Sequence, residues 1–151
     1  MPSLVTRPVR AFEAAGPLLL SAVTSLATLG TCLYYGIHPP WCCYDRGVYV
    51  ASVFFTLFCM AGICALSILA ILLQLRGSFK HAATLAISLP FIAGTQILLI
   101  FLSIGMRMGS IVVLEVIPWL TTAVMVFSCH AAINAVYVLQ AVRFTDAMLE
   151  D

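Results

Sequence analysis

The sequence predicts an all-α fold, an integral membrane bundle of four transmembrane helices in one domain, residues 1–151. Of its 151 residues, 63% are apolar and only 9% are charged, and the mean hydropathy is +1.12. A soluble domain usually carries about a quarter charged residues. The formal net charge of +1 provides no electrostatic basis for binding DNA or RNA. We therefore expect the lipid bilayer as the main partner, and no nucleic acid.

Four windows that are almost free of charged residues predict the spans, at about 17–37, 48–75, 82–106 and 111–141. Each window is long enough, because about 20 apolar residues at 1.5 Å each cross about 30 Å of hydrocarbon. A membrane β-barrel would instead alternate apolar and polar residues in segments of about ten. The apolar run Leu66–Leu73 does not alternate, so the spans are expected to be helices.

Short connections are expected between the spans. Pro39 and Pro40 should end the first span, because proline interrupts helical hydrogen bonding. Tight turns are expected at Arg76–His81 and at Arg107–Ser110. An aromatic belt of the kind found at membrane interfaces lies around the first connection, formed by Tyr34, Tyr35, Trp41, Tyr44 and Tyr49.

The distribution of basic residues predicts the orientation. Five of the seven Lys and Arg residues fall on one side of the predicted spans, namely Arg7, Arg10, Arg76, Lys80 and Arg143. Arg46 and Arg107 fall on the other side. Basic residues in short loops mark the cytoplasmic face. Both termini are therefore expected in the cytoplasm, and the plasma membrane is favoured over an organelle.

Two polar residues within the fourth span form a candidate helix-packing switch. His130 and Asn134 are four residues apart, so they share one face of a helix. An ionisable side chain at membrane depth is a functional candidate by default. The simpler interpretation, which we favour, is a neutral histidine and an amide that bond to a neighbouring helix.

Other span residues are candidates for a hinge and for ligand contact. Pro90 and Gly94 form a candidate hinge, although proline and glycine also occur in ordinary membrane-helix packing. Gln96 and Glu115 are candidate ligand-facing residues. The favoured alternative for Glu115 is an interfacial carboxylate near a helix N-terminus, where the helix dipole stabilises it.

Six cysteines are present, and Cys42 and Cys43 are the candidates for a disulfide because they fall in the predicted outer loop. Adjacent cysteines rarely bond each other, so another chain or a missing segment would supply the partner. The other four are expected to act as small apolar residues. No metal-ligand spacing, phosphate loop or nucleophile–base pair is recognisable. We therefore expect no metal, no cofactor and no enzymatic activity.

The last predicted span carries a family resemblance. It opens with Ile117-Pro118-Trp119-Leu120, closes with the stretch Ser128–Leu139, and is followed by Arg143-Phe144. This pattern resembles the seventh helix of the nematode seven-transmembrane chemoreceptors of the Srh- and Str-like kind. The resemblance implies that the four spans correspond to receptor spans four to seven. It also implies a truncated G-protein-coupled receptor in which a small ligand shifts the balance between two helix packings.

Three functions stay open at this point. The first is the receptor-like chemosensory protein, with a missing receptor half and a small-molecule ligand. The second is a tetraspan scaffold or accessory subunit of another membrane protein, favoured by short loops and small residues at four-residue spacing, including Ser21/Ser25, Ala61/Ala65 and Ala131/Ala135. The third is a small transporter or channel subunit, which would need more polar lining than Gln96, Glu115, His130 and Asn134 supply.

Overall fold

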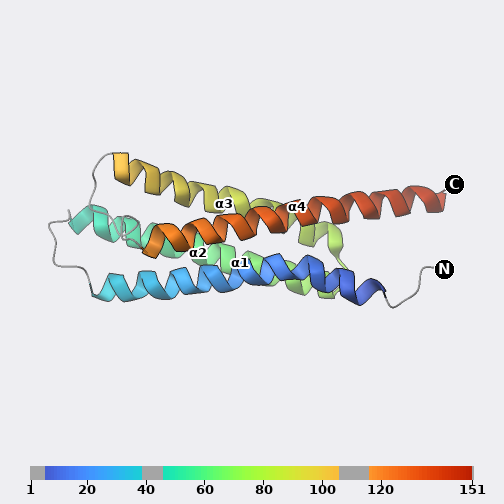
Figure 1. Ribbon diagram of the computed structural model, residues 1–151, viewed down its shortest axis with the longest axis horizontal. Coiled ribbons are helices and arrows are strands. Elements are labelled where there is room, and N and C mark those ends of the chain that lie inside the picture. Colours follow the sequence, from blue (N-terminus) through green and yellow to red (C-terminus); the bar gives the residue numbers. More distant parts are fainter. Residues whose placement is uncertain (1–5, 39–45, 106–115, 151) are drawn as a thin grey trace.

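The computed structural model describes residues 6–38, 46–105 and 116–150, and the described residues form four α-helices and no strand. The helices are α1 (Thr6–Ile37), α2 (Arg46–Leu75), α3 (Phe79–Gly105) and α4 (Val116–Glu150). They lie side by side as one elongated bundle (Figure 1). The predicted all-α fold of four long helices is confirmed.

The four helices form a closed ring with alternating directions. Each helix packs against its neighbours in the sequence, and α1 also packs closely against α4. The start of α1 and the end of α4 lie at the same end of the bundle, and α4 extends beyond the other helices there (Figure 1). An even number of spans requires this arrangement of the ends. The cytoplasmic location of that end stays a prediction.

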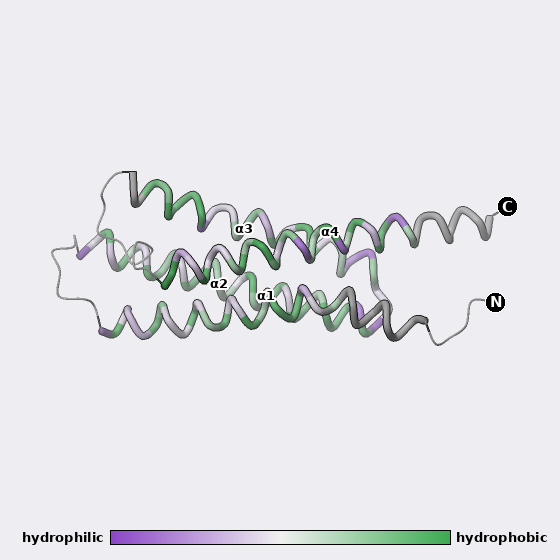
Figure 2. The backbone as a smooth tube through the Cα atoms, viewed as in Figure 1, coloured by the Kyte–Doolittle hydropathy of each residue, from purple (hydrophilic) through white to green (hydrophobic). Residues whose placement is uncertain are grey.

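The outer surface of the bundle is largely apolar, as expected for a protein that lies in a membrane. Hydrophobic residues follow the helices along most of their length (Figure 2). Several of the largest project outward, with 81% of Phe58, 78% of Trp119 and 73% of Phe91 exposed. Each helix contains a stretch long and apolar enough to cross a bilayer: Ala15–Ile37, Arg46–Leu75, Phe79–Leu102 and Val116–Ala141. A soluble protein does not expose apolar area on this scale, so the chain is a multi-pass membrane protein.

The turn between α2 and α3 is shorter than predicted. Gly77 has a φ of +79°, and the N–H groups of Gly77 and Ser78 donate to the carbonyls of Gln74 (3.0 Å) and Leu73 (2.9 Å). This pair of bonds is a Schellman motif, which ends α2. α3 then begins at Phe79, so the prediction of a turn through His81 was wrong. Lys80 and His81 fall outside the charge-free window, but a helix tolerates such residues where it extends beyond the hydrocarbon.

The other helix ends agree with the prediction in part. α1 ends at Ile37, just before Pro39 and Pro40, as predicted. α1 starts well before the predicted span and α4 continues to Glu150, because a helix need not end where the hydrocarbon ends. The predicted turn Arg107–Ser110 and the predicted start of the fourth span at residue 111 lie outside the described residues.

The bundle core is apolar and contains many small residues. Its largest buried side chains come from all four helices and include Leu18, Met60, Ile63, Leu89 and Val124. Alanines fill much of the remaining interior and let the helices approach closely; these are Ala70, Ala83, Ala86, Ala93, Ala131 and Ala135. Ala61 and Ala65, by contrast, lie on the exposed surface of α2.

Candidate functional site

Buried polar side chains line the interior of the bundle on all four helices. No more than 4% of any of these side chains is exposed. The nine residues are Ser21, Ser25, Thr28, Ser52, Thr56, Ser67, Gln96, Thr121 and Ser128. Several hydroxyls donate to carbonyls of their own helix: Ser25 to Ala22 (2.9 Å) and Thr121 to Ile117 (2.8 Å) are examples. A bond of this kind satisfies the hydroxyl without a partner helix. Hydroxyls that bond in this way fit inside the membrane without requiring water, whereas the buried Oγ of Ser67 has no hydrogen-bond partner among the described residues.

Two buried hydrogen bonds join neighbouring helices. The hydroxyls of Ser21 on α1 and Ser128 on α4 lie 3.1 Å apart. The side-chain N–H of Gln96 on α3 donates to the hydroxyl of Thr56 on α2 over 2.8 Å. Interhelical bonds in membranes contribute about 0.6–2 kcal/mol each. The interior polar groups that reach across the bundle thus stabilise the ring.

Gln96 does not lie in an open ligand site. The residue is fully buried, and its amide nitrogen is engaged with Thr56. Its Oε1 has no hydrogen-bond partner among the described residues. Gln96 therefore joins α3 to α2 through its amide nitrogen, and its role as a ligand-facing residue stays a prediction.

The structure separates the side chains of His130 and Asn134 from the bundle core. His130 is exposed and Asn134 is half-buried, and the structure gives neither a hydrogen bond to a described residue. The inward face of α4 is formed instead by Val124, Ser128 and Ala131. His130 does not pack into the interior of this bundle, and the helix-packing switch of His130 and Asn134 stays a prediction. The four-residue spacing predicts that His130 and Asn134 share one face of the helix, but it does not predict whether that face points into the bundle.

The remaining predicted site residues are only partly placed. α3 continues through Pro90, and both Pro90 and Gly94 are half-buried. Proline has no N–H, so the Ala86 carbonyl lacks its usual helical partner. A Cβ atom on Gly94 would meet nothing within 4 Å, so packing does not require a glycine there. The hinge stays a prediction, and Glu115, Cys42 and Cys43 lie outside the described residues.

The described cysteines and histidines provide no metal site. Cys32 and Cys59 are buried, Cys64 and Cys129 are half-buried, and all four are free thiols. Within the described ranges, no group of three or more His, Cys, Asp or Glu residues could hold a metal ion. The Cys32 thiol lies 3.7 Å from the Val53 carbonyl, which places it in the contact between α1 and α2.

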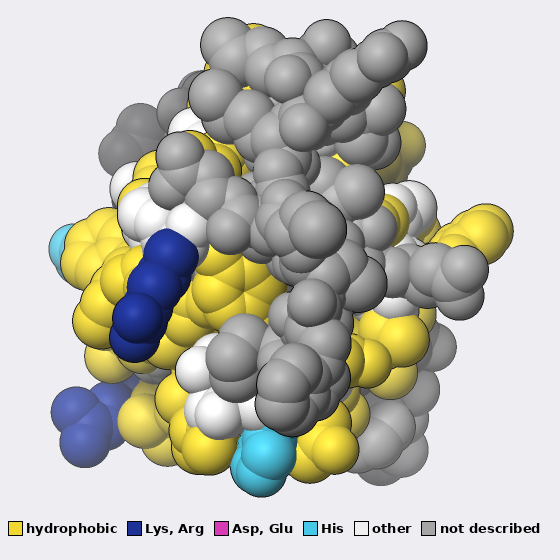
Figure 3. Space-filling model, turned by 90° about the vertical axis from the view of Figure 1, so that its left-hand side faces the viewer, with side chains coloured by type: hydrophobic (Ala, Val, Ile, Leu, Met, Phe, Trp, Pro, Cys, Tyr) yellow, Lys and Arg dark blue, Asp and Glu magenta, His cyan; other side chains and the backbone are white. Residues whose placement is uncertain are grey.

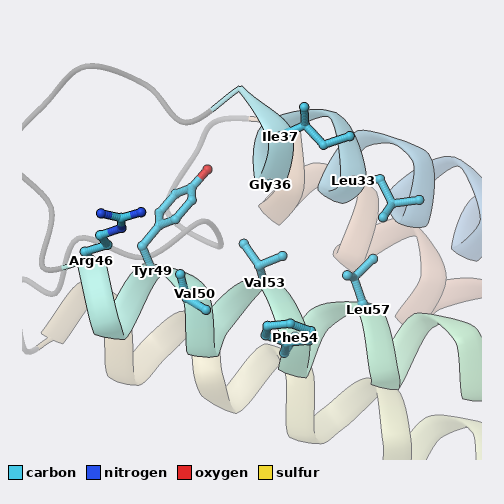
Figure 4. A pocket seen from close by; sticks show the side chains of 9 residues that line it. All are labelled: Leu33, Gly36, Ile37, Arg46, Tyr49, Val50, Val53, Phe54 and Leu57. Atoms are coloured by element: carbon cyan, nitrogen blue, oxygen red, sulfur yellow. The ribbon is translucent and has the colours of Figure 1, made fainter.

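Sequence reasoning missed a groove between the end of α1 and the start of α2. It is an open groove with a volume of about 460 Å³, and Figure 4 shows side chains of both helices around it. Leu33, Gly36 and Ile37 of α1 line one side, and α2 lines the other with Arg46, Tyr49, Val50, Val53, Phe54 and Leu57. In the sequence, the groove is indicated only by a helical spacing that places four of its lining residues on one face of α2, namely Arg46, Val50, Val53 and Leu57.

Two features set the shape of this groove. The Tyr49 hydroxyl donates to the Tyr35 carbonyl over 2.6 Å and so joins α2 to α1. A Cβ atom on Gly36 would approach Cγ1 of Val53 to 3.2 Å, so a glycine permits the close approach of the helices. The view onto this end of the bundle shows one Lys or Arg side chain in the foreground, among hydrophobic ones (Figure 3). All six acidic residues lie outside the part whose side chains are described.

No protein-family model, no curated protein and no solved structure matches this chain. The resemblance of the last span to nematode chemoreceptors therefore depends on the residues of that span alone.

Proposed function

We propose that the chain is a tetraspan that acts as a scaffold or accessory subunit by binding another membrane protein laterally. The observation that carries the proposal is the contact between α1 and α4, which closes the ring. The Ser21–Ser128 hydrogen bond lies in that contact. The first and last of the four helices therefore cover one side of the bundle interior.

The same contact weighs against the alternative of a receptor fragment. If α1 and α4 were spans four and seven of a seven-helix ring, other spans would separate them in both directions around the ring. Here they are neighbours. A transporter or channel is also less well supported, because buried hydroxyls bond to their own helices and Gln96 is engaged with Thr56.

The outer surface supports lateral binding. Aromatic side chains project from three helices, at Phe58 on α2, Phe91 on α3 and Trp119 on α4. Helix association in membranes depends on van der Waals packing between such surfaces. The plasma membrane is the location that we propose for this association.

A photoreactive phenylalanine analogue tests the proposal when it is placed singly at Phe58, Phe91 or Trp119. We expect one discrete protein adduct after illumination in native membranes, formed from one helix face and absent from the other faces. The fully buried Met60 is the matched control, because its side chain contacts only the bundle itself. Adducts to lipid alone from all three positions would overturn the proposal.

A further inference from the structure

We propose that the groove between α1 and α2 binds one phospholipid molecule, with the lipid phosphate on Arg46 and one acyl chain along the apolar floor. The proposal concerns a lipid that is held at a defined place, in addition to the bulk lipid around every membrane protein. It does not depend on the scaffold function.

The charge at the mouth of the groove matches a phosphate. Among the described residues that line it, Arg46 alone is charged, and its side chain lies at the end of the groove away from Leu57 (Figure 4). Arginine binds phosphate through parallel N–H···O bonds, which are stronger than bonds between neutral groups. Arg46 is also the first residue of α2, where the positive end of the helix dipole favours an anion.

The length of the groove matches one leaflet of a bilayer. Arg46 and Leu57 are eleven residues apart, which corresponds to about 16 Å along a helix at 1.5 Å per residue. Half of the hydrocarbon core is about 15 Å thick. A lipid with its phosphate at Arg46 would therefore lay an acyl chain beside Val50, Val53 and Leu57. A transmembrane helix of a partner would instead continue past Leu57.

Contacts within the chain hold the groove in shape. The bond from Tyr49 to the Tyr35 carbonyl joins its two walls, and Gly36 leaves space that a larger residue would fill. Walls that are held in this way lower the entropic cost of ordering the protein around a lipid. The lipid would gain both the phosphate contact and acyl-chain packing on the concave floor.

Native mass spectrometry of the detergent-purified full chain tests the proposal, with phosphatidylglycerol, phosphatidylcholine and diacylglycerol of identical acyl chains as probes. We expect one bound phospholipid with either headgroup and much weaker retention of diacylglycerol, which lacks the phosphate. Arg46→Gln should weaken phospholipid retention about tenfold, since it removes a charge-assisted hydrogen bond. Arg76→Gln is the matched control, because Arg76 is exposed just beyond the end of α2, outside the groove.

A second pair of variants tests the floor of the groove without changing charge. Val50→Phe should occupy the groove and reduce retention, whereas Val126→Phe adds the same bulk to an exposed position on α4 and should leave retention unchanged. Equal retention of diacylglycerol and phospholipids, or equal losses in the Arg46→Gln and Arg76→Gln variants, would overturn the proposal. So would a tightly bound protein in place of the lipid.

Discussion

The hydroxyls of Ser21 and Ser128 lie 3.1 Å apart, across a separation of 107 residues in the sequence. Their contact joins the first helix to the last at a fully buried position. This hydrogen bond closes the ring of helices, because it joins the first helix of the bundle to the last one.

We predict that a Ser21→Cys, Ser128→Cys double variant forms an intramolecular disulfide in native membranes. A sulfur pair in place of the two hydroxyls needs only a small adjustment to reach the bond length of about 2.05 Å. The measurement is the shift in gel mobility after mild oxidation, with the natural cysteines replaced. Ser21→Cys with Val126→Cys is the control, since Val126 points away from the core. A cross-link in neither pair, or in both, would contradict the closed ring.

The bond between Gln96 and Thr56 should be measurable as a coupling between α2 and α3. In a double-mutant cycle with Gln96→Leu and Thr56→Val, we expect a coupling free energy of about 0.6–2 kcal/mol. The single Gln96→Leu change also removes the unpartnered Oε1, so its own cost should be small. Reversible unfolding in detergent micelles is the measurement. Strictly additive effects would show that the bond contributes nothing.

The number of helices could be predicted because it depends on the length of each apolar stretch, which can be read from that stretch alone. Apolar length fixed the number of helices, and Pro39 and Pro40 correctly indicated where α1 ends. The second window also ended at residue 75, where α2 ends, although hydropathy does not report the left-handed backbone of Gly77 and the two hydrogen bonds that end the helix. The start of α3 was misplaced because Lys80 and His81 belong to the helix but not to a charge-free window.

The candidate site was harder to predict because it depends on how each helix is rotated about its axis. His130 and Gln96 look alike in sequence, as single polar residues within an apolar span. The structure places Gln96 in the core and His130 on the outside. The groove at Arg46 combines residues from two helices, so no single segment of sequence could indicate it.

Gly77 should resist substitution more than Gly94. Gly77→Ala places a side chain on a residue with a φ of +79°, and we expect a cost of about 1–2 kcal/mol in the free energy of unfolding. Gly94→Ala is the matched control, because Gly94 lies within α3 and its Cβ atom would meet nothing within 4 Å. That change should stabilise the protein by about 0.5–1 kcal/mol. Thermal unfolding of both variants in the same detergent makes the comparison, and equal shifts would contradict the turn geometry.

His130→Ala should leave the stability of the isolated protein within about 0.5 kcal/mol of the parent, because the side chain is exposed on α4. The neighbouring Ala131 is only 2% exposed, so Ala131→Leu should destabilise by about 1–3 kcal/mol through overpacking. Both changes lie on the same turn of the same helix, so they separate the outward face from the inward one. A large loss of stability in purified His130→Ala would restore the packing role that the sequence predicted. If the loss occurs only in native membranes, the histidine faces a partner, and the position would then mark the surface through which the tetraspan binds it.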